Sequence, residues 1–420
     1  MPIAALPEYL QKQDFSMASP GMRFGMYLKL WGENHELKKI DWRTADRIWP
    51  RNKKKPKWED ADNKRSAIDH ACKLSSHDEA ALVALNHRQQ ALAKSVRDVF
   101  FFPAKSAAPF TTGLGNEHPL ENGFAFLWPY GLPYLPGSGV KGVLRQTVRE
   151  ITKGMWDEST WNSETVAEVK INKKPVQLTA LDLLFGLESE DGKQVHYRGV
   201  LSFWDVIPEI KGNQLMVEIM TAHQSHYHAN SKPPHDSGQP NPISFLTVPP
   251  DSSFNFHVQC DLPRLQQLAP SLAENGQWQT LLQTAFEHAF DWLGFGAKTA
   301  VGYGAMRVDQ SREEERREQA EKEAARRRRE AELASMPPVE RDIVEIMERG
   351  GDNPPVALFQ KLEEGKWKDP DDCRCVAEKI RELWQQEGKW NPGFSGTNKK
   401  KAKQKERCLA VLRHLEGGDG

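Results

Sequence analysis

The change in composition near residue 309 constrains this chain more than any other feature. Short apolar runs and glycine loops precede it, whereas Ser311–Glu332 carries eight basic and eight acidic residues. That segment has no apolar stripe wide enough for a core, so it predicts a solvated helical connector held by pairs four residues apart. The 420 residues also exceed the roughly 250–300 at which one hydrophobic core stops growing. We therefore expect several structural units.

Beyond the connector, apolar residues recur at helical spacing in Val339–Met347, Val356–Leu362 and Cys373–Trp384. They predict a small helical tail domain. The predicted organisation has four segments. They are an N-terminal strand with a helical and basic insertion (1–110), a core (111–308), a charged helical connector (309–335) and the tail domain (336–420).

The segment before the connector has the pattern of an α+β domain. Amphipathic helices are predicted from Asp78 to about Val99, from Ser138, and over Leu281–Leu293. Between them lie short β-branched or aromatic runs bounded by Pro, Gly and Asn, which favour a split β-α-β sheet. These runs are Val200–Val206, Leu215–Met220, Ile243–Val248, Phe254–Val258 and Ala305–Val308.

Charge and hydropathy exclude some functions. No apolar run approaches the ~20 residues that cross a bilayer, and Met1–Leu10 lacks the order of a signal peptide. Five scattered cysteines suit a reducing compartment. We expect a cytoplasmic protein with no membrane partner. The net charge of -1 argues against nucleic acid unless the charge is segregated along the chain.

The most informative segment is Tyr134–Arg145, where a Pro-Gly-Ser-Gly turn leads into an amphipathic helix. A helix start attracts phosphate through unpaired N–H groups and the helix dipole. Gly137 and Ser138 form this start, and we expect Ser138 to cap it. Lys141, Arg145 and Arg149 follow at spacing four, as a basic stripe that could track a phosphate backbone. An ordinary capped helix with a solvated basic face is the alternative.

A second candidate is the glycine-rich segment Leu293–Gly304. It follows a helix and precedes a strand, the reverse of the order in dinucleotide and triphosphate motifs, so no nucleotide cofactor is expected. What remains is a backbone-rich loop suited to a nucleic-acid backbone, or a turn that only packs. The candidate residues are Gly296, Lys298, Thr299 and Tyr303.

These segments belong to an ordered set that resembles the RAMP superfamily of CRISPR-associated RNA-binding proteins. Within it, the chain resembles the sixth RAMP subunit of type III-B (Cmr) effector complexes. Gly131–Gly142 resembles the central signature and Gly294–Gly304 the glycine-rich loop, while Met22–Lys29 fits a first strand and Thr112–Phe124 an entry strand with its loop. Leu184–Gly186, Gly199–Asp205, Met220–His223 and Pro242–Leu246 continue the order.

The resemblance implies a ferredoxin-like, RRM-type core with helical insertions and an α-helical C-terminal extension. Residues 1–110 and 111–308 then form one RAMP domain. Such a subunit binds guide RNA or the guide–target duplex at the 3′ end of the guide and caps a filament of other RAMP subunits. The family's cleaving aspartate belongs to a different subunit, and Asp205 has no carboxylate partner nearby in sequence, so we expect a non-catalytic protein without a cofactor.

A histidine-rich loop supplies the last candidate. His223 matches the family and is expected to contact RNA, while His226, His228 and His235 match no zinc spacing, so no metal is expected. A metal-independent endonuclease with His223 or His226 as general base is one alternative, and an architectural subunit without RNA contact is another.

Weaker signals come from two basic runs and from the tryptophans. Arg51–Lys57 and Lys399–Lys405 could neutralise phosphates, although such runs are usually solvated. Trp128, Trp204 and Trp292 have apolar neighbours in sequence and are expected to be core.

Overall fold

The computed structural model describes residues 3–4, 6–11, 13–34, 39–44, 67–120, 122–154, 161–188, 196–222, 233, 241–349 and 353–416. The chain divides into two compact units, Met1–Glu314 and Glu315–Gly420. Within the described ranges, no helix is both long and apolar enough to cross a membrane.

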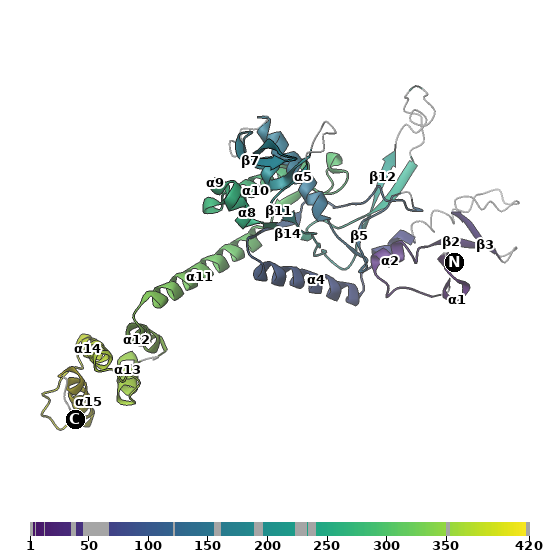
Figure 1. Ribbon diagram of the computed structural model, residues 1–420. Helices are drawn as coiled ribbons and strands as arrows, with labels where there is room; N and C mark the ends of the chain where they lie inside the picture. Colours follow the sequence, from purple (N-terminus) through teal and green to yellow (C-terminus); the bar gives the residue numbers. More distant parts are fainter. Residues whose placement is uncertain are drawn as a thin grey trace. The chain divides into compact units, whose positions relative to one another are not determined.

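A four-stranded sheet is the centre of the first unit (Figure 1). Its strands are β4 (Val99–Ser106), β11 (Leu201–Phe203), β14 (Ser253–Cys260) and β15 (Met306–Val308), in the order β11-β14-β4-β15, with every neighbour antiparallel. Helix α5 (Gly137–Thr152) lies between β4 and β11 in the chain, and α10 (Gln277–His288) between β14 and β15. The connection from β4 to β11 therefore passes β14, and the connection from β14 to β15 passes β4. The predicted α+β class is confirmed.

Alternation along the central strands builds the core. On β4, Phe100, Phe102 and Ala104 are buried against the helices, whereas the intervening side chains point to the other face. The ring of Phe286, on α10, lies 5.2 Å from that of Phe102 and 5.0 Å from that of Phe256. Each such buried aromatic contributes roughly 1.5–3 kcal/mol of apolar burial, so this cluster fixes α10 on the sheet.

Hairpins and short helices surround this core. Figure 1 shows α4 (Ser76–Ser95) on the opposite side of β14 from α5 and α10. The long hairpin β12 (Met216–Ala222) and β13 (Asn241–Thr247) projects from the same unit. The other elements are β1 (Ile3–Ala4), α1 (Glu8–Gln11), α2 (Pro20–Phe24), β2 (Lys29–Asn34), β3 (Lys39–Thr44), β5 (Phe126–Leu127), β6 (Leu132–Pro133), β7 (Thr165–Ile171), β8 (Lys174–Thr179), α6 (Ala180–Phe185), β9 (Gly186–Glu188), β10 (His196–Arg198), α8 (Leu262–Leu268), α9 (Pro270–Ala273), η1 (Glu274–Gly276), η2 (Ala289–Leu293) and η3 (Thr299–Val301).

The predicted charged helix is α11 (Gln310–Ser335), and exposed ion pairs four residues apart, such as Lys322 with Glu318, support it. The second unit continues with α12 (Pro338–Arg349), α13 (Pro354–Glu363), α14 (Pro370–Gln386) and α15 (Lys399–Leu415). Its own core contains Ile380 and Trp384, both fully buried. The predicted tail segment thus contains the three expected helices and α15 as an additional one. The boundaries of the four-segment organisation stay predictions.

Several expectations about local structure were wrong. Met22–Lys29 is not a strand, because α2 occupies its start and β2 begins only at Lys29. Among the described residues of Thr112–Phe124 there is no strand, and the strand that enters the sheet is β4, just before it. Helix α4 ends at Ser95, four residues earlier than expected. The basic run Arg51–Lys57 lies outside the described residues.

Candidate nucleic-acid interface

The start of α5 lies directly against the end of β11. A Cβ on Gly137 would stand 2.2 Å from the carbonyl oxygen of Phe203, so the close approach requires glycine. The backbone N–H of Gly137 donates to Oδ1 of Asp205 over 2.8 Å. A carboxylate from a segment 68 residues away thus satisfies one of the orphan N–H groups of this helix.

This pairing corrects the predicted cap. The helix begins at Gly137, after Pro136, and no side chain of its own N-terminal residues caps it, so Ser138 is not the cap. The carboxylate of Asp205 lies where the helix dipole favours an anion. Ser138 is exposed. An anion at this helix start would therefore have the Asp205 carboxylate as a neighbour.

The remainder of α5 separates an apolar face from a basic one. Val140, Leu144 and Val148 are buried in the core. Lys141 and Arg145 are half-buried at its border, and Arg149 is exposed. The predicted amphipathic helix is confirmed, while contact of its basic residues with RNA stays a prediction.

The glycine-rich loop closes tightly on its own backbone. Gly294, Gly296, Gly302 and Gly304 all have positive φ, between 70° and 94°, and Lys298 has φ 59°. The N–H of Phe295 donates to the carbonyl of Gly304 over 2.9 Å. A Cβ on Gly304 would meet the carbonyl oxygen of Phe295 at 1.8 Å. Packing therefore explains Gly296 and Gly304, whereas a Cβ on Gly302 would meet nothing within 4 Å and only its positive φ favours glycine there. The loop's chemistry must come from its side chains.

Two of those side chains lie against the β12–β13 hairpin. The ammonium of Lys298 is 5.7 Å from the centroid of the Phe245 ring, and the hydroxyl of Tyr303 donates to Glu218 over 3.3 Å. Burial and the neighbouring Glu218 carboxylate raise the pKa of Tyr303. Thr299 begins the 3-10 turn η3 and is half-buried.

The structure thus joins the glycine loop to the hairpin that carries the histidine segment. His223 follows Ala222, the last residue of β12, but it lies outside the described residues. His226, His228 and His235 also lie outside them. In the part of the chain that the structure describes, no group of three His, Cys, Asp or Glu side chains could hold a metal ion.

The sheet face opposite α10 is closed by side chains of the protein itself. On β14, Asn255 is 2% exposed and His257 is 3% exposed. The guanidinium of Arg312 donates to Asn255 over 3.1 Å, and to Glu209 over 2.6 and 3.0 Å, which fixes the first turn of α11 over this face. Trp204 stacks on the ring of His257, with centroids 5.3 Å apart. A nucleobase could not reach this face of β14.

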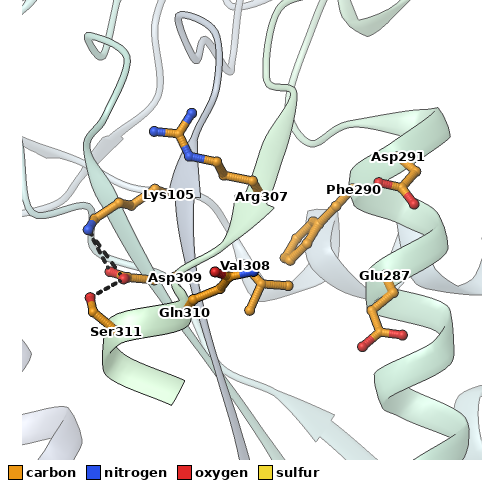
Figure 2. A pocket seen from close by; sticks show the side chains of 9 residues that line it. All are labelled: Lys105, Glu287, Phe290, Asp291, Arg307, Val308, Asp309, Gln310 and Ser311. Carbon is orange, nitrogen blue, oxygen red and sulfur yellow. Dashed lines mark hydrogen bonds and ion pairs between the residues drawn. The ribbon is translucent and has the colours of Figure 1, made fainter. Parts of the chain in front are cut away.

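A cavity of about 700 Å³ opens at the outer edge strand β15 (Figure 2). Lys105 reaches Asp309 at 3.2 Å, and the hydroxyl of Ser311 donates to the same carboxylate over 2.7 Å. Burial raises the pKa of Asp309, but hydrogen bonds from Ser311 and Lys105 outweigh it and hold the pKa below its usual value. Glu287 and Asp291 line the cavity too. Its mixed charge does not favour phosphate, and it holds no predicted site residue.

Sequence reasoning misplaced two tryptophans. Trp128 is 70% exposed on the β5–β6 turn, and Trp292 is 62% exposed on η2. Apolar neighbours in sequence suggested burial, but a turn and the outer side of a helix direct these rings outward. Trp204 is half-buried on His257. The adjacent Trp-Pro turn was the signal available for Trp128.

Comparison with known proteins finds similarity to one family over the segment that holds this site. The family model of the RAMP superfamily matches residues 105–307, which include both α5 and the glycine-rich loop. Over these residues the chain is similar to the RAMP superfamily. A curated RAMP relative, the CRISPR system Cmr subunit Cmr6 of Pyrococcus furiosus, is 27% identical over 246 residues. That alignment covers 48% of this chain and 66% of the relative, so the chain spans just under two thirds of its length.

Solved structures give matches of the same kind. A chain in the cryo-EM structure of a type III-B Cmr-beta complex bound to cognate target RNA is 16% identical, with TM-score 0.41, covering 61% of this chain and 76% of that chain. The crystal structure of Cmr6 from Pyrococcus furiosus is 27% identical, with TM-score 0.27, covering 50% and 97%. The resemblance inferred from the sequence motifs is confirmed by the family and relative matches.

Proposed function

We propose that this chain is a non-catalytic RNA-binding subunit of a type III-B CRISPR interference complex. Its partners are guide RNA, target RNA and other RAMP subunits, and it caps the 3′ end of the guide or guide–target duplex. The β4-α5-β11-β14-α10-β15 order supports a ferredoxin-like, RRM-type core. The similarity to Cmr6 of Pyrococcus furiosus, which extends over 246 residues, supports a type III-B complex.

The closed sheet face is the observation that favours RNA binding through the phosphate backbone over base stacking on the sheet. An RRM stacks bases on its sheet, but here Asn255 and His257 are buried beneath Arg312 and Trp204. The basic side chains of the family-matched segment lie instead at its helix start and glycine loop, on Lys141, Arg145 and Lys298. Such groups read the phosphate backbone rather than base identity, and guide–target pairing supplies the sequence recognition.

Replacing these three cations tests the proposal. The variant is Lys141→Gln, Arg145→Gln and Lys298→Asn, since Asn tolerates the positive φ of position 298. Each lost phosphate contact lowers the salt slope of single-stranded RNA binding by about 0.7, so three should lower it by about 2. The control removes the same charge from three exposed lysines, Lys153, Lys170 and Lys174, by Gln.

Fluorescence anisotropy with guide RNA at several salt concentrations measures both slopes. The control should bind like the wild-type chain, and equal slopes for both variants would refute contact at these sites. Crosslinking in the reconstituted complex then tests the position. Peptides of residues 135–145 and 294–304 should attach to the 3′ end of the guide, and attachment only at its 5′ end would refute the cap.

Catalysis by the histidine loop is the competing function. Incubating the purified chain with CRISPR repeat RNA should leave that RNA intact. Site-specific cleavage that His223→Ala abolishes would replace the non-catalytic proposal with an endonuclease.

A further inference from the structure

The start of α15 carries an unusually dense group of cations. Lys399, Lys400, Lys401 and Lys403 are all exposed, and Lys405 follows half-buried. From Lys389 to Arg413 the chain holds eight lysines and arginines against one carboxylate, Glu406. This segment lies in the second compact unit, outside the residues 105–307 that match the family model. Its chemistry is therefore separate from the interface described above.

The arrangement opposes the rules that stabilise helices. The first turn of α15 has no acidic residue, although the positive end of a helix dipole disfavours cations. Lys399 with Lys403, and Lys401 with Lys405, place like charges four residues apart, where they repel. By contrast, α14 in the same unit has Asp371 and Asp372 in its first turn.

Two contacts hold this cationic helix start in place despite its repulsion. Asn398 accepts hydrogen bonds from the backbone N–H groups of Lys400 and Lys401, over 3.0 and 3.3 Å. Lys405 donates to the carbonyl of Phe394 over 2.8 Å. The buried Cys408 and Val411 fix the following turns in the core of the unit. The cations are thus presented on an ordered helix.

We propose that the exposed lysines at the start of α15 form a second RNA-binding surface, which takes the phosphate backbone of single-stranded RNA. A docking surface for protein normally has an apolar centre. Here the exposed residues from Lys399 to Lys403 offer only ammonium groups and the methyl of Ala402. Phosphates spaced along a strand match such a row, and counterion release favours the contact. The proposal takes its choice of RNA from the proposed function.

The test uses the full chain and a uridine homopolymer of about 40 nucleotides, which has no sequence or structure to read. The variant replaces Lys399, Lys400, Lys401 and Lys403 with Gln, which preserves helix propensity. The control variant removes four charges from ion-paired positions of the same unit by Gln, three of them exposed and Lys379 half-buried. These positions are Lys322, Arg326, Lys361 and Lys379.

In the α15 variant the salt slope of RNA binding should be smaller by about 3. Its affinity for the RNA at ~0.1 M salt should be lower by about tenfold or more. The control should stay within about twofold of the wild-type chain. Polyglutamate, the second probe, should not displace the RNA from the wild-type chain or from the control variant. A slope equal to that of the control, or polyglutamate bound by the lysines as tightly as RNA, would overturn the inference. Unchanged far-ultraviolet circular dichroism verifies that α15 is intact.

Combination with the variant of Lys141, Arg145 and Lys298 separates the two proposals. Loss only in that variant rejects the α15 surface and leaves the proposed function in place. Loss only in the α15 variant rejects the contacts of the RAMP core. Loss in both, with a larger loss in the combined variant, supports both, because linked sites raise each other's effective concentration.

Discussion

Gly137→Ala should be the most damaging single methyl addition in α5. The new Cβ would stand 2.2 Å from the carbonyl oxygen of Phe203 and 3.0 Å from the carbonyl carbon of Trp204. Both are backbone atoms, and Trp204 is anchored by its N–H bond to His257 at 3.1 Å. The start of the helix must therefore move by about 1 Å away from β11, since the β11–β14 pairing resists the opposite movement.

The cost follows from two losses. Overpacking of this kind costs about 1–3 kcal/mol. Movement also weakens the bond from the Gly137 N–H to Asp205, and a hydrogen bond to a charged group is worth about 1.5–3 kcal/mol. Ala recovers less than about 1 kcal/mol of helix propensity at the first helical position. We expect the free energy of unfolding of the Met1–Glu314 unit to fall by about 2–4 kcal/mol.

Gly142→Ala is the matched control, because a Cβ at position 142 of the same helix would meet nothing within 4 Å. It should raise stability by up to about 1 kcal/mol. Urea unfolding, followed by far-ultraviolet circular dichroism with separate transitions fitted for the two units, measures both variants. A Gly137→Ala chain as stable as the wild type would refute the close approach of α5 to β11.

Two further substitutions test the charges around this interface. Asp205→Asn keeps an acceptor for the Gly137 N–H but removes the anion beside the helix start. It should cost about 0.3–1 kcal/mol of stability and raise guide-RNA affinity severalfold in anisotropy titrations, whereas weaker binding by the folded variant would place the phosphate elsewhere. Burial lowers the pKa of His257 to about 4 from the model-peptide value of 6.5. The unfolded chain therefore binds the extra proton first, so up to about 3 kcal/mol of stability present above pH 6.5 is lost as the pH falls toward 4. His257→Phe should weaken the dependence of the free energy of unfolding on pH between 6.5 and 4. An unchanged pH dependence would mean that other groups cause the loss of stability.

Helices were predictable where apolar residues follow a period of 3.6. Val140, Leu144 and Ile151 of α5 occupy one buried face, as their spacing indicates. Strand β4 was missed because Val99–Phe102 is a continuous apolar run that directly follows a helix, and periodicity cannot separate strand from helix in such a run. Helix α15 was missed because its lysines give the pattern of a solvated loop.

The details of the candidate site depend on contacts between distant segments. Asp205 meets Gly137 across 68 residues, and Arg312 meets Glu209 across 103. No local pattern encodes such pairs, so the sequence predicted the helix start but neither its carboxylate partner nor the closed sheet face. Exposure of Trp128 likewise depends on the turn geometry of its hairpin rather than on its apolar neighbours.

A net charge of -1 is compatible with the proposed RNA contacts, because electrostatic contacts with RNA are local. At physiological ionic strength the screening length is about 8 Å, so a phosphate responds to the few cations beside it and not to the sum over the chain. In Ser311–Glu332 eight cations lie among eight carboxylates and cancel at short range. Between Lys389 and Arg413 eight cations face only Glu406. The same number of positive charges therefore gives a neutral helix in one segment and a phosphate-attracting surface in the other.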